Sequence, residues 1–221
     1  MDPDLDVATG EAGRLAGALQ VRDEVSAVAV EVKSLVQDGD LSQARERFAD
    51  IVRLEQRRAS RIAYHFLRDG ADADEAVQDA FLKVFSHISS FREEMPFEVW
   101  FTRILINGCL DRQKARRRRA RWLVPAADTE SGDRDGLEAM AGNAPSPENL
   151  LVSRERRRRL AAAVGALRGR QRTVFLLCHF DGRSPREVGA LTGLRESTVR
   201  VHLFRAVRRL RTHLEGNRDT D

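Results

Sequence analysis

Apolar residues recur along this chain at steps of three and four, which is the spacing of one face of an α-helix. The spacing holds over 41–67, 72–88 and 97–121, and it returns in shorter segments over 148–167, 171–180, 185–192 and 196–214. No segment alternates apolar and polar residues as a strand of a sheet requires. All six prolines fall in predicted loops or at a helix start. The pattern therefore predicts an all-α protein.

A stretch without this spacing separates the two helical regions. Residues 122–147 are rich in acidic residues, glycine and alanine, and they end in the break Pro145-Ser146-Pro147. Because few of these side chains could form a core, we interpret the stretch as a linker. We therefore expect two small helical domains, 41–121 and 148–215, joined by an acidic flexible linker and followed by a short tail over 216–221.

Residues 1–40 precede the first domain as an N-terminal extension without an assigned role. Apolar residues between Leu15 and Val36 roughly fit one helix face, and the residues from Gln37 to Asp40 have the composition of a turn. Two interpretations stay open for this extension: an additional docking helix, or a partly disordered tail.

The segment from Phe97 to Arg121 has an apolar half and a cationic half. Its apolar positions share one helical face: Phe97, Trp100, Phe101, Ile104, Leu105 and Leu110. Its cationic positions are Arg112, Lys114, Arg116, Arg117, Arg118, Arg119 and Arg121. A helix that is buried at one end and positively charged at the other is suited to a phosphate backbone. The alternative is a solvated arginine-rich face without a ligand.

Near the C-terminus the sequence has the features of a helix-turn-helix. Ser184 and Glu187 form a capping box around Pro185, and Gly193 ends the short helix that follows. In the second helix the expected core positions are Val199, Leu203, Val207 and Leu210, and the expected outer positions are Arg200, Val201, Phe204, Arg205 and Arg208. Arginine on such a face can read guanine in the major groove. The alternative is that Phe204 packs inward and the arginines bind phosphates alone.

Composition excludes several classes of function. The net charge is only +4, but arginine clusters alternate with acidic stretches, which favours partners of opposite charge. No apolar run is long enough to span a membrane, and the acidic N-terminus is unlike a secretory signal, so we expect a cytoplasmic protein without membrane insertion. Two cysteines, Cys109 and Cys178, are too few for a disulfide framework or a zinc site. The sequence has no phosphate loop or nucleophile motif, so we expect no catalytic residue, no metal and no cofactor.

Two motifs together resemble a known family. The segment DADEAVQDAFLKVF, followed by FREEMPFEVWFTRILINGCLDRQKARRRR, resembles region 2 of bacterial sigma factors, and in particular of the small extracytoplasmic-function (ECF) group. The segment GLRESTVRVHLFRAVRRLR resembles region 4 of the same family. The resemblance implies an RNA polymerase sigma factor: a promoter-melting helical bundle over 41–121, a linker, and a helix-turn-helix over 148–215.

The resemblance also implies the partners and the residues that bind them. Core RNA polymerase, through its β′ clamp and β flap, would be the main partner, together with promoter DNA and an inhibitory anti-sigma factor. The polymerase-binding face would be Asp74, Glu75, Gln78 and Asp79. The loop and helix from Phe91 onward would open the minus-ten element and hold a flipped base, with Asn107, Asp111, Arg112, Arg116, Arg117, Arg118 and Arg119 on the DNA. The minus-thirty-five element would be read by Arg195, Ser197, Thr198, Arg200, Val201, Phe204 and Arg205.

Two other functions remain open at this point. A helix-turn-helix activator or repressor would bind duplex DNA tightly without polymerase, and 41–119 would then serve dimerisation or another partner. An RNA-binding or adaptor protein would use its arginine patches with little sequence preference and with strong salt dependence.

Overall fold

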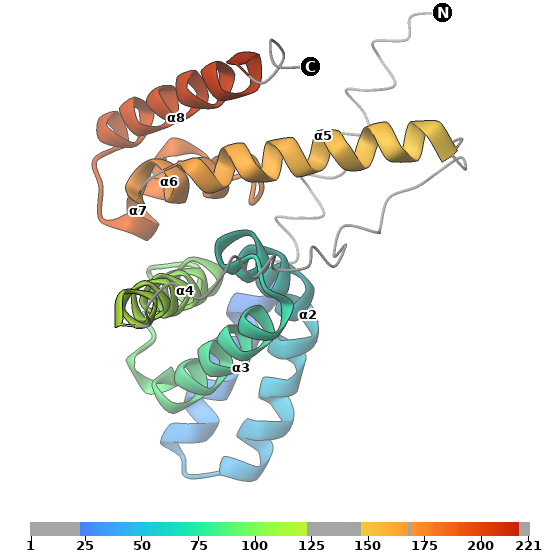
Figure 1. The fold of residues 1–221 in the computed structure, drawn as a ribbon. Helices are drawn as coiled ribbons and strands as arrows, with labels where there is room; N and C mark the ends of the chain where they lie inside the picture. Colours follow the sequence, from blue (N-terminus) through green and yellow to red (C-terminus); the bar gives the residue numbers. More distant parts are fainter. Residues whose placement is uncertain (1–22, 123–146, 168, 217–221) are drawn as a thin grey trace, which may run out of the picture. The chain divides into compact units, whose positions relative to one another are not determined.

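The computed structural model describes residues 23–122, 147–167 and 169–216. Within these residues the secondary structure is helical, without a strand, so the all-α prediction is confirmed (Figure 1). The chain divides into two compact units, Met1–Pro125 and Ala126–Asp221. Most of the predicted linker, 123–146, and the end of the tail, 217–221, lie outside the described residues. Among the described helices none is long and apolar enough to cross a membrane.

The first unit packs four helices around a core of aromatic and branched side chains. A helix over 23–37 is followed by α2 (Leu41–Leu67), α3 (Gly70–Ser86), a 3-10 turn η1 (Ile88–Ser90) and α4 (Phe97–Trp122). Each long helix contacts the other two (Figure 1). Rings from all three meet in the core: Phe81 lies between Phe48, with ring centroids 6.3 Å apart, and Phe101, at 4.8 Å.

Helix α3 begins closer to the end of α2 than the sequence predicts. The periodic segment predicts a helix from residue 72, but α3 begins at Gly70 and its cap is Asp69. The reason is that Arg68 adopts a left-handed conformation, with φ 58°, and ends α2 abruptly. Asp69 then follows in an extended conformation, and its carboxylate accepts a hydrogen bond from the Asp72 amide at 2.9 Å.

The extension before the first domain is resolved in part. Residues 23–37 form a helix whose inner side chains, Val25, Val28, Ala29 and Val32, are buried. This helix therefore belongs to the core of the first unit and is not a tail. The apolar positions before residue 23 lie outside the described residues.

A buried ion cluster joins α2 to the start of α4. Arg58 contacts the carboxylates of Glu55 at 3.0 Å and Glu98 at 2.9 Å, and it donates to the Thr102 hydroxyl at 3.0 Å. Both carboxylates are almost fully buried. Removing two charges from water is costly, and the shared guanidinium offsets that cost.

The second unit contains α5 (Pro147–Ala166), α6 (Gly169–His179), α7 (Pro185–Thr192) and α8 (Glu196–Gly216). The capping box of Ser184 and Glu187 is present, and Gly193 ends α7 with φ 70°, so both predictions are confirmed. The core side of α8 differs from the prediction at one position. Val207 is 38% exposed, whereas Ala206 is fully buried. The buried stripe thus runs through Val199, Ala206 and Leu210, with Leu203 half-buried beside them, and it follows the helical period more closely than a step to Val207.

Candidate functional site

The outer face of α3 carries the residues predicted to bind polymerase. Asp74, Glu75, Gln78 and Asp79 are all exposed, and their spacing places them on one side of the helix. The opposite side is buried in the core through Ala73, Val77 and other apolar residues. The structure adds Leu82, one turn beyond Gln78 and 69% exposed. Leu82 was not predicted as part of this face, although the helical period places it beside Gln78 and Asp79.

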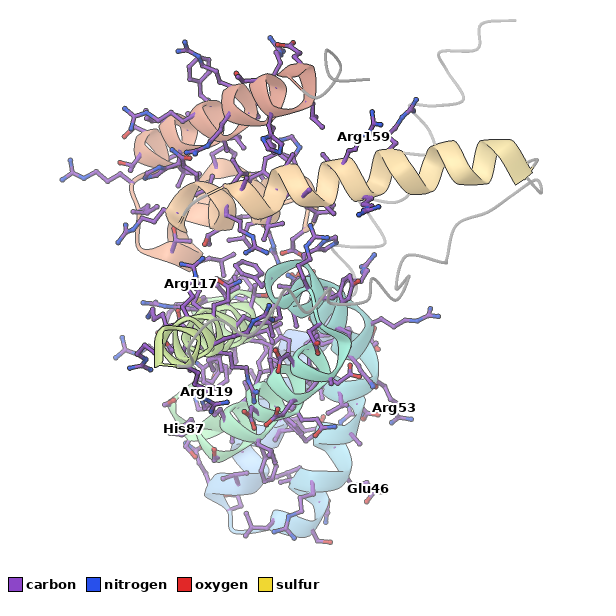
Figure 2. All side chains as sticks on the ribbon, in the orientation of Figure 1. Glu46, Arg53, His87, Arg117, Arg119 and Arg159 are labelled. Atoms are coloured by element: carbon purple, nitrogen blue, oxygen red, sulfur yellow. The ribbon has the colours of Figure 1, made fainter. Side chains whose placement is uncertain are left out.

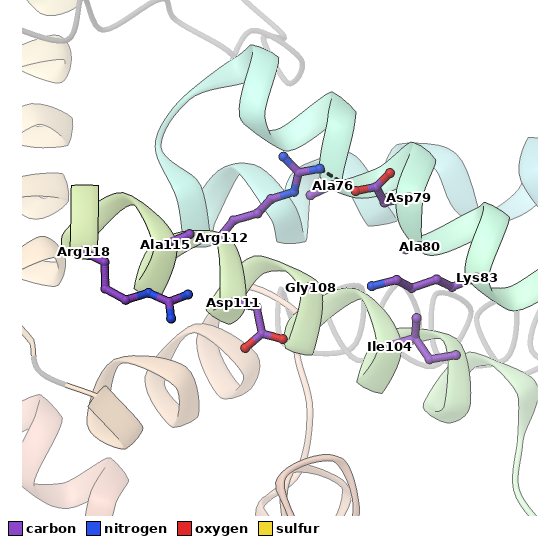
Figure 3. Close-up of a pocket in the computed structure, with 10 residues that line it drawn as sticks. All are labelled: Ala76, Asp79, Ala80, Lys83, Ile104, Gly108, Asp111, Arg112, Ala115 and Arg118. Atoms are coloured by element: carbon purple, nitrogen blue, oxygen red, sulfur yellow. Dashed lines mark hydrogen bonds and ion pairs between the residues drawn. The ribbon is translucent and has the colours of Figure 1, made fainter. Parts of the chain in front are cut away.

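Two of these acidic residues already hold a cation of α4. Arg112 contacts the Glu75 carboxylate at 2.9 Å. It also contacts the Asp79 carboxylate at 2.5 Å (Figure 3). Hydrogen bonds to Glu75 and Asp79 outweigh the opposing effect of burial and raise the pKa of Arg112. One turn further on, Arg116 approaches Asp72 at 3.9 Å. The predicted polymerase face and the predicted DNA-binding helix therefore meet through ion pairs.

The cationic half of α4 presents more than one face. The spacing of Asn107, Asp111 and Arg118 places them on one side of the helix, whereas Arg112 points toward α3 (Figure 3). Arg117 and Arg119 leave the helix in different directions (Figure 2). Arg116 to Arg119 are exposed, and Asp111 pairs with Lys114 at 3.0 Å. The predicted minus-ten residues are thus on one helix but not on one surface.

An open groove of about 340 Å³ lies on the surface between α3 and α4, beside Arg112. Small residues such as Ala76, Ala80 and Gly108 line it, and Lys83, Asp111 and Arg118 supply charge at its margins (Figure 3). A Cβ atom added at Gly108 would meet nothing within 4 Å. Gly108 therefore lies beside open space, and α4 continues through it to Trp122.

The outer face of α8 brings the predicted minus-thirty-five residues together. Val201 and Phe204 are 46% and 66% exposed, and Ser197, Arg200 and Arg205 are exposed as well. These side chains lie opposite the buried stripe of α8, so the inward packing of Phe204 is wrong. Arg200 pairs with Glu196 at 2.6 Å along the same helix. Arg195 is exposed just before the helix begins, and Thr198 is half-buried.

A second groove, of about 650 Å³, extends the cationic surface toward the end of α8. It lies between α5 and α8 and is lined by Ala163, Ala166, Arg205, Arg208, Arg209, Thr212 and His213. Arg208 was predicted on the outer face of α8. The groove was not predicted, because α5 and α8 are far apart in the sequence.

The corner before α7 is held by a buried arginine. Arg183 has a side chain only 1% exposed and contacts Asp181 and Glu187, each at 3.0 Å. Burial opposes ionisation of Glu187, but hydrogen bonds from the Ser184 amide and hydroxyl and from Arg183 outweigh it and lower the pKa of Glu187 to about 2. These bonds fix the angle at which the chain enters the helix-turn-helix.

The low pKa of Glu187 predicts an acid dependence of stability in the second unit. A carboxylate with a lowered pKa in the folded state stabilises the fold above its ordinary pKa of 4.5, and that contribution is lost as the pH falls toward about 2. We expect Glu187→Gln to be less stable than wild type at pH 7 and equally stable near pH 2, by circular dichroism of thermal unfolding. Glu215→Gln, at an exposed position of α8, is the control. A deficit of Glu187→Gln that persists at pH 2 would contradict this origin.

The two cysteines differ in burial. Cys109 is buried, and burial raises the pKa of its thiol to about 12. Cys178 is half-buried, and burial raises its pKa too. Cys109 therefore packs in the core of the first unit.

The fold and the surfaces described above define a helical protein with a helix-turn-helix and a second cationic helix. Models of the sigma-70 family match both parts in order: sigma-70 region 2 matches residues 51–120 and sigma-70 region 4 matches residues 157–210. The chain therefore belongs to the sigma-70 family, and the relatives that share its sequence belong to the ECF group of that family.

Several curated proteins are similar to this chain. The ECF RNA polymerase sigma factor SigE of Mycolicibacterium smegmatis is 30% identical over 165 residues, which cover 75% of this chain and 60% of that protein. The ECF RNA polymerase sigma-E factor of Escherichia coli K12 is 28% identical over 173 residues, covering 77% of this chain and 86% of that protein. The ECF RNA polymerase sigma factor SigW of Bacillus subtilis is 27% identical over 173 residues, which cover 77% of this chain and 90% of that protein.

Solved structures show the same fold. CnrH, in complex with the cytosolic domain of CnrY, matches with a TM-score of 0.59 and 21% identity over 86% of this chain and 97% of CnrH. The sigma factor RpoE of Bartonella quintana, in complex with the anti-sigma factor NepR, matches with a TM-score of 0.55 and 19% identity over 76% of this chain and 96% of RpoE.

Proposed function

We propose that this protein is an RNA polymerase sigma factor of the ECF type, which binds core polymerase, directs it to specific promoters and assists DNA melting. The observation that carries the proposal is the match of region 2 and region 4 models, in that order, to the two helical units. Such a factor acts as a non-enzymatic specificity subunit.

The α3 face is proposed to dock on the β′ clamp. Acidic groups on an exposed helix are suited to a basic partner, and Gln78 can donate and accept hydrogen bonds between them. Leu82 adds an exposed apolar side chain at the edge of the same face, where it can be desolvated on binding. The second unit is proposed to contact the β flap.

Promoter DNA is proposed to bind at both units. In the first unit the cations of α4 offset phosphate charge, while the loop before α4 holds an unstacked base of the minus-ten element. Unstacking costs a few kcal/mol, which stacking and backbone contacts must offset. In the second unit the outer face of α8 enters the major groove, where Arg200 or Arg205 can reach base edges and Phe204 can contact a thymine methyl group.

An anti-sigma factor is proposed as the regulator, and the cytoplasm as the place of action. This proposal is supported by two similar structures, both of which are complexes with another chain: CnrH with the cytosolic domain of CnrY, and RpoE with the anti-sigma factor NepR.

The test is run-off transcription by bacterial core polymerase on a pool of genomic promoter fragments, with and without this protein. Because Glu75 and Asp79 also hold Arg112, the sharper docking variant is Asp74→Ala with Gln78→Ala. We expect specific transcripts with wild type, and roughly a tenfold loss or more with the variant when sigma is limiting.

Glu46→Ala is the matched control, since Glu46 is an exposed acidic residue of α2 in the same unit (Figure 2). It should transcribe like wild type. Absence of transcripts and of polymerase binding, with duplex DNA still bound in a sequence-specific manner, would instead identify a helix-turn-helix activator or repressor.

A further inference from the structure

The helix over 23–37 contacts the segment that leads into α4. This segment, residues 91–96, connects η1 to α4 and is called here the α4-entry loop. Lys33 of the helix bonds to this loop, and Ser26 bonds to Phe97, the first residue of α4 directly after it. Ser26 and Lys33 are seven residues apart, which places them on the same side of the helix, two turns from each other.

Ser26 bonds to the first amide of α4. The amides in the first turn of a helix have no partner within the helix and need an acceptor from elsewhere. A preceding serine, threonine, aspartate or asparagine commonly supplies it, but Pro96 precedes α4 and has no acceptor in its side chain. Instead, the Phe97 amide donates to the Ser26 hydroxyl oxygen at 3.2 Å, across 71 positions of the chain. Ser26 therefore caps the N-terminus of α4 from a distant part of the chain.

Lys33 bonds to the middle of the α4-entry loop. Its ammonium group lies 3.2 Å from the Glu93 carboxylate. The Lys33 side chain is 19% exposed and Glu93 is 58% exposed, so the contact reaches from the helix surface out to the exposed part of the loop. It therefore ties the exposed part of the loop to the helix.

The two ends of the loop are fixed by aromatic packing. Phe91 at its start is buried and lies 5.6 Å from the Phe97 ring and 5.4 Å from the Trp100 ring. The residues between the ends, from Arg92 to Glu94, are exposed. Lys33 is therefore placed to set the conformation of the exposed part, while the core sets the ends.

We propose that the helix over 23–37 positions the α4-entry loop for capture of an unpaired base of the non-template DNA strand, through Ser26 and Lys33. This inference rests on the proposed sigma-factor function. The physical reason is preorganisation: a loop held in its binding conformation loses less conformational freedom when the strand binds. Ser26 and Lys33 are positioning residues that act through the loop.

The test measures how holoenzyme that contains the whole chain of 221 residues binds two templates made from a promoter found by run-off transcription. One template has a premelted minus-ten element, and the other is fully duplex and carries the minus-thirty-five element alone. We expect Ser26→Ala with Lys33→Met to bind the premelted template roughly fivefold to tenfold more weakly, since the lost cap and ion pair are each worth a factor of a few. Its binding to core polymerase and to the duplex template should match wild type.

The same helix offers a matched control. Glu31 contacts Arg47 of α2 at 2.7 Å, so Glu31→Gln removes an ion pair of this helix that is remote from the loop. It should bind the premelted template like wild type. An equal loss in both variants would overturn the proposal, because the helix would then act through the stability of the unit alone.

A charge exchange separates positioning from direct DNA contact. Lys33→Glu should bind the premelted template most weakly, and adding Glu93→Lys should restore binding to within about twofold, since the pair is re-formed with its charges reversed. Failure of this rescue would overturn the positioning role and indicate that Lys33 binds phosphate itself. If wild type gives no transcripts, the proposed sigma-factor function is refuted. If wild type transcribes and the variants bind the premelted template as well as wild type does, the positioning role alone is refuted.

Discussion

Replacing Arg58 by methionine is expected to destabilise the first unit by about 3–5 kcal/mol, because two buried carboxylates would lose the cation that they share. Arg58 bonds to Glu55 of its own helix and to Glu98 in the first turn of α4. Both tryptophans, Trp100 and Trp122, belong to the first unit. Denaturant unfolding followed by tryptophan fluorescence therefore measures this unit without the other.

Arg57→Met is the control, because Arg57 is the neighbouring residue on α2 and is exposed. Its effect should stay within about 0.5 kcal/mol. Combining Arg58→Met with Glu55→Gln and Glu98→Gln should recover much of the lost stability, since no buried charge then lacks its cation. Equal denaturant midpoints for Arg57→Met and Arg58→Met would show that the ion cluster of Arg58 contributes nothing to the free energy of unfolding.

Substitution of Gly189 by valine is expected to abolish minus-thirty-five recognition. Gly189 lies in α7, and a Cβ atom at this position would come within 2.8 Å of the Leu194 carbonyl oxygen in the turn before α8. That oxygen belongs to the backbone, so α7 and α8 would have to move apart. Such overpacking typically costs about 1–3 kcal/mol, and it would also misplace the face of α8 that carries Phe204 and Arg205. Footprinting of duplex promoter DNA measures the loss.

Gly165→Ala provides the comparison for this variant. Gly165 is a helical, exposed glycine of α5, and a Cβ atom there would meet nothing within 4 Å. Alanine should leave DNA binding intact and raise stability by up to about 1 kcal/mol. If Gly189→Val protects the minus-thirty-five element as wild type does, the close approach of α7 to the Leu194 carbonyl oxygen does not set the position of α8.

Local signals in the sequence predicted most of the helices and the corner of the helix-turn-helix. The capping box of Ser184 and Glu187 and the left-handed Gly193 involve neighbouring residues only, so the sequence pattern is sufficient to find them. The sigma-family resemblance is confirmed by the region 2 and region 4 matches. The proposed roles of the site residues stay predictions.

Features that depend on distant residues, or on an unusual backbone conformation, could not be predicted. Arg58 resembles the other arginines in the sequence, and only its tertiary partner Glu98 explains why it is half-buried. The role of Asp69 as a cap depended on the left-handed conformation of Arg68, an unusual conformation for a residue other than glycine. The bond from Phe97 to Ser26 spans 71 positions, so helical periodicity carries no information about it.

The pairing of Arg112 with Glu75 and Asp79 has a consequence for how the free protein responds to salt. A cation that binds DNA phosphate releases condensed counterions, and each such contact adds about 0.9 to the slope of log affinity against log salt. Arg112 is neutralised within its own unit, so it does not add to this slope unless its carboxylates find another partner. The count of arginines on α4 therefore overstates the nonspecific attraction of the isolated protein for nucleic acid.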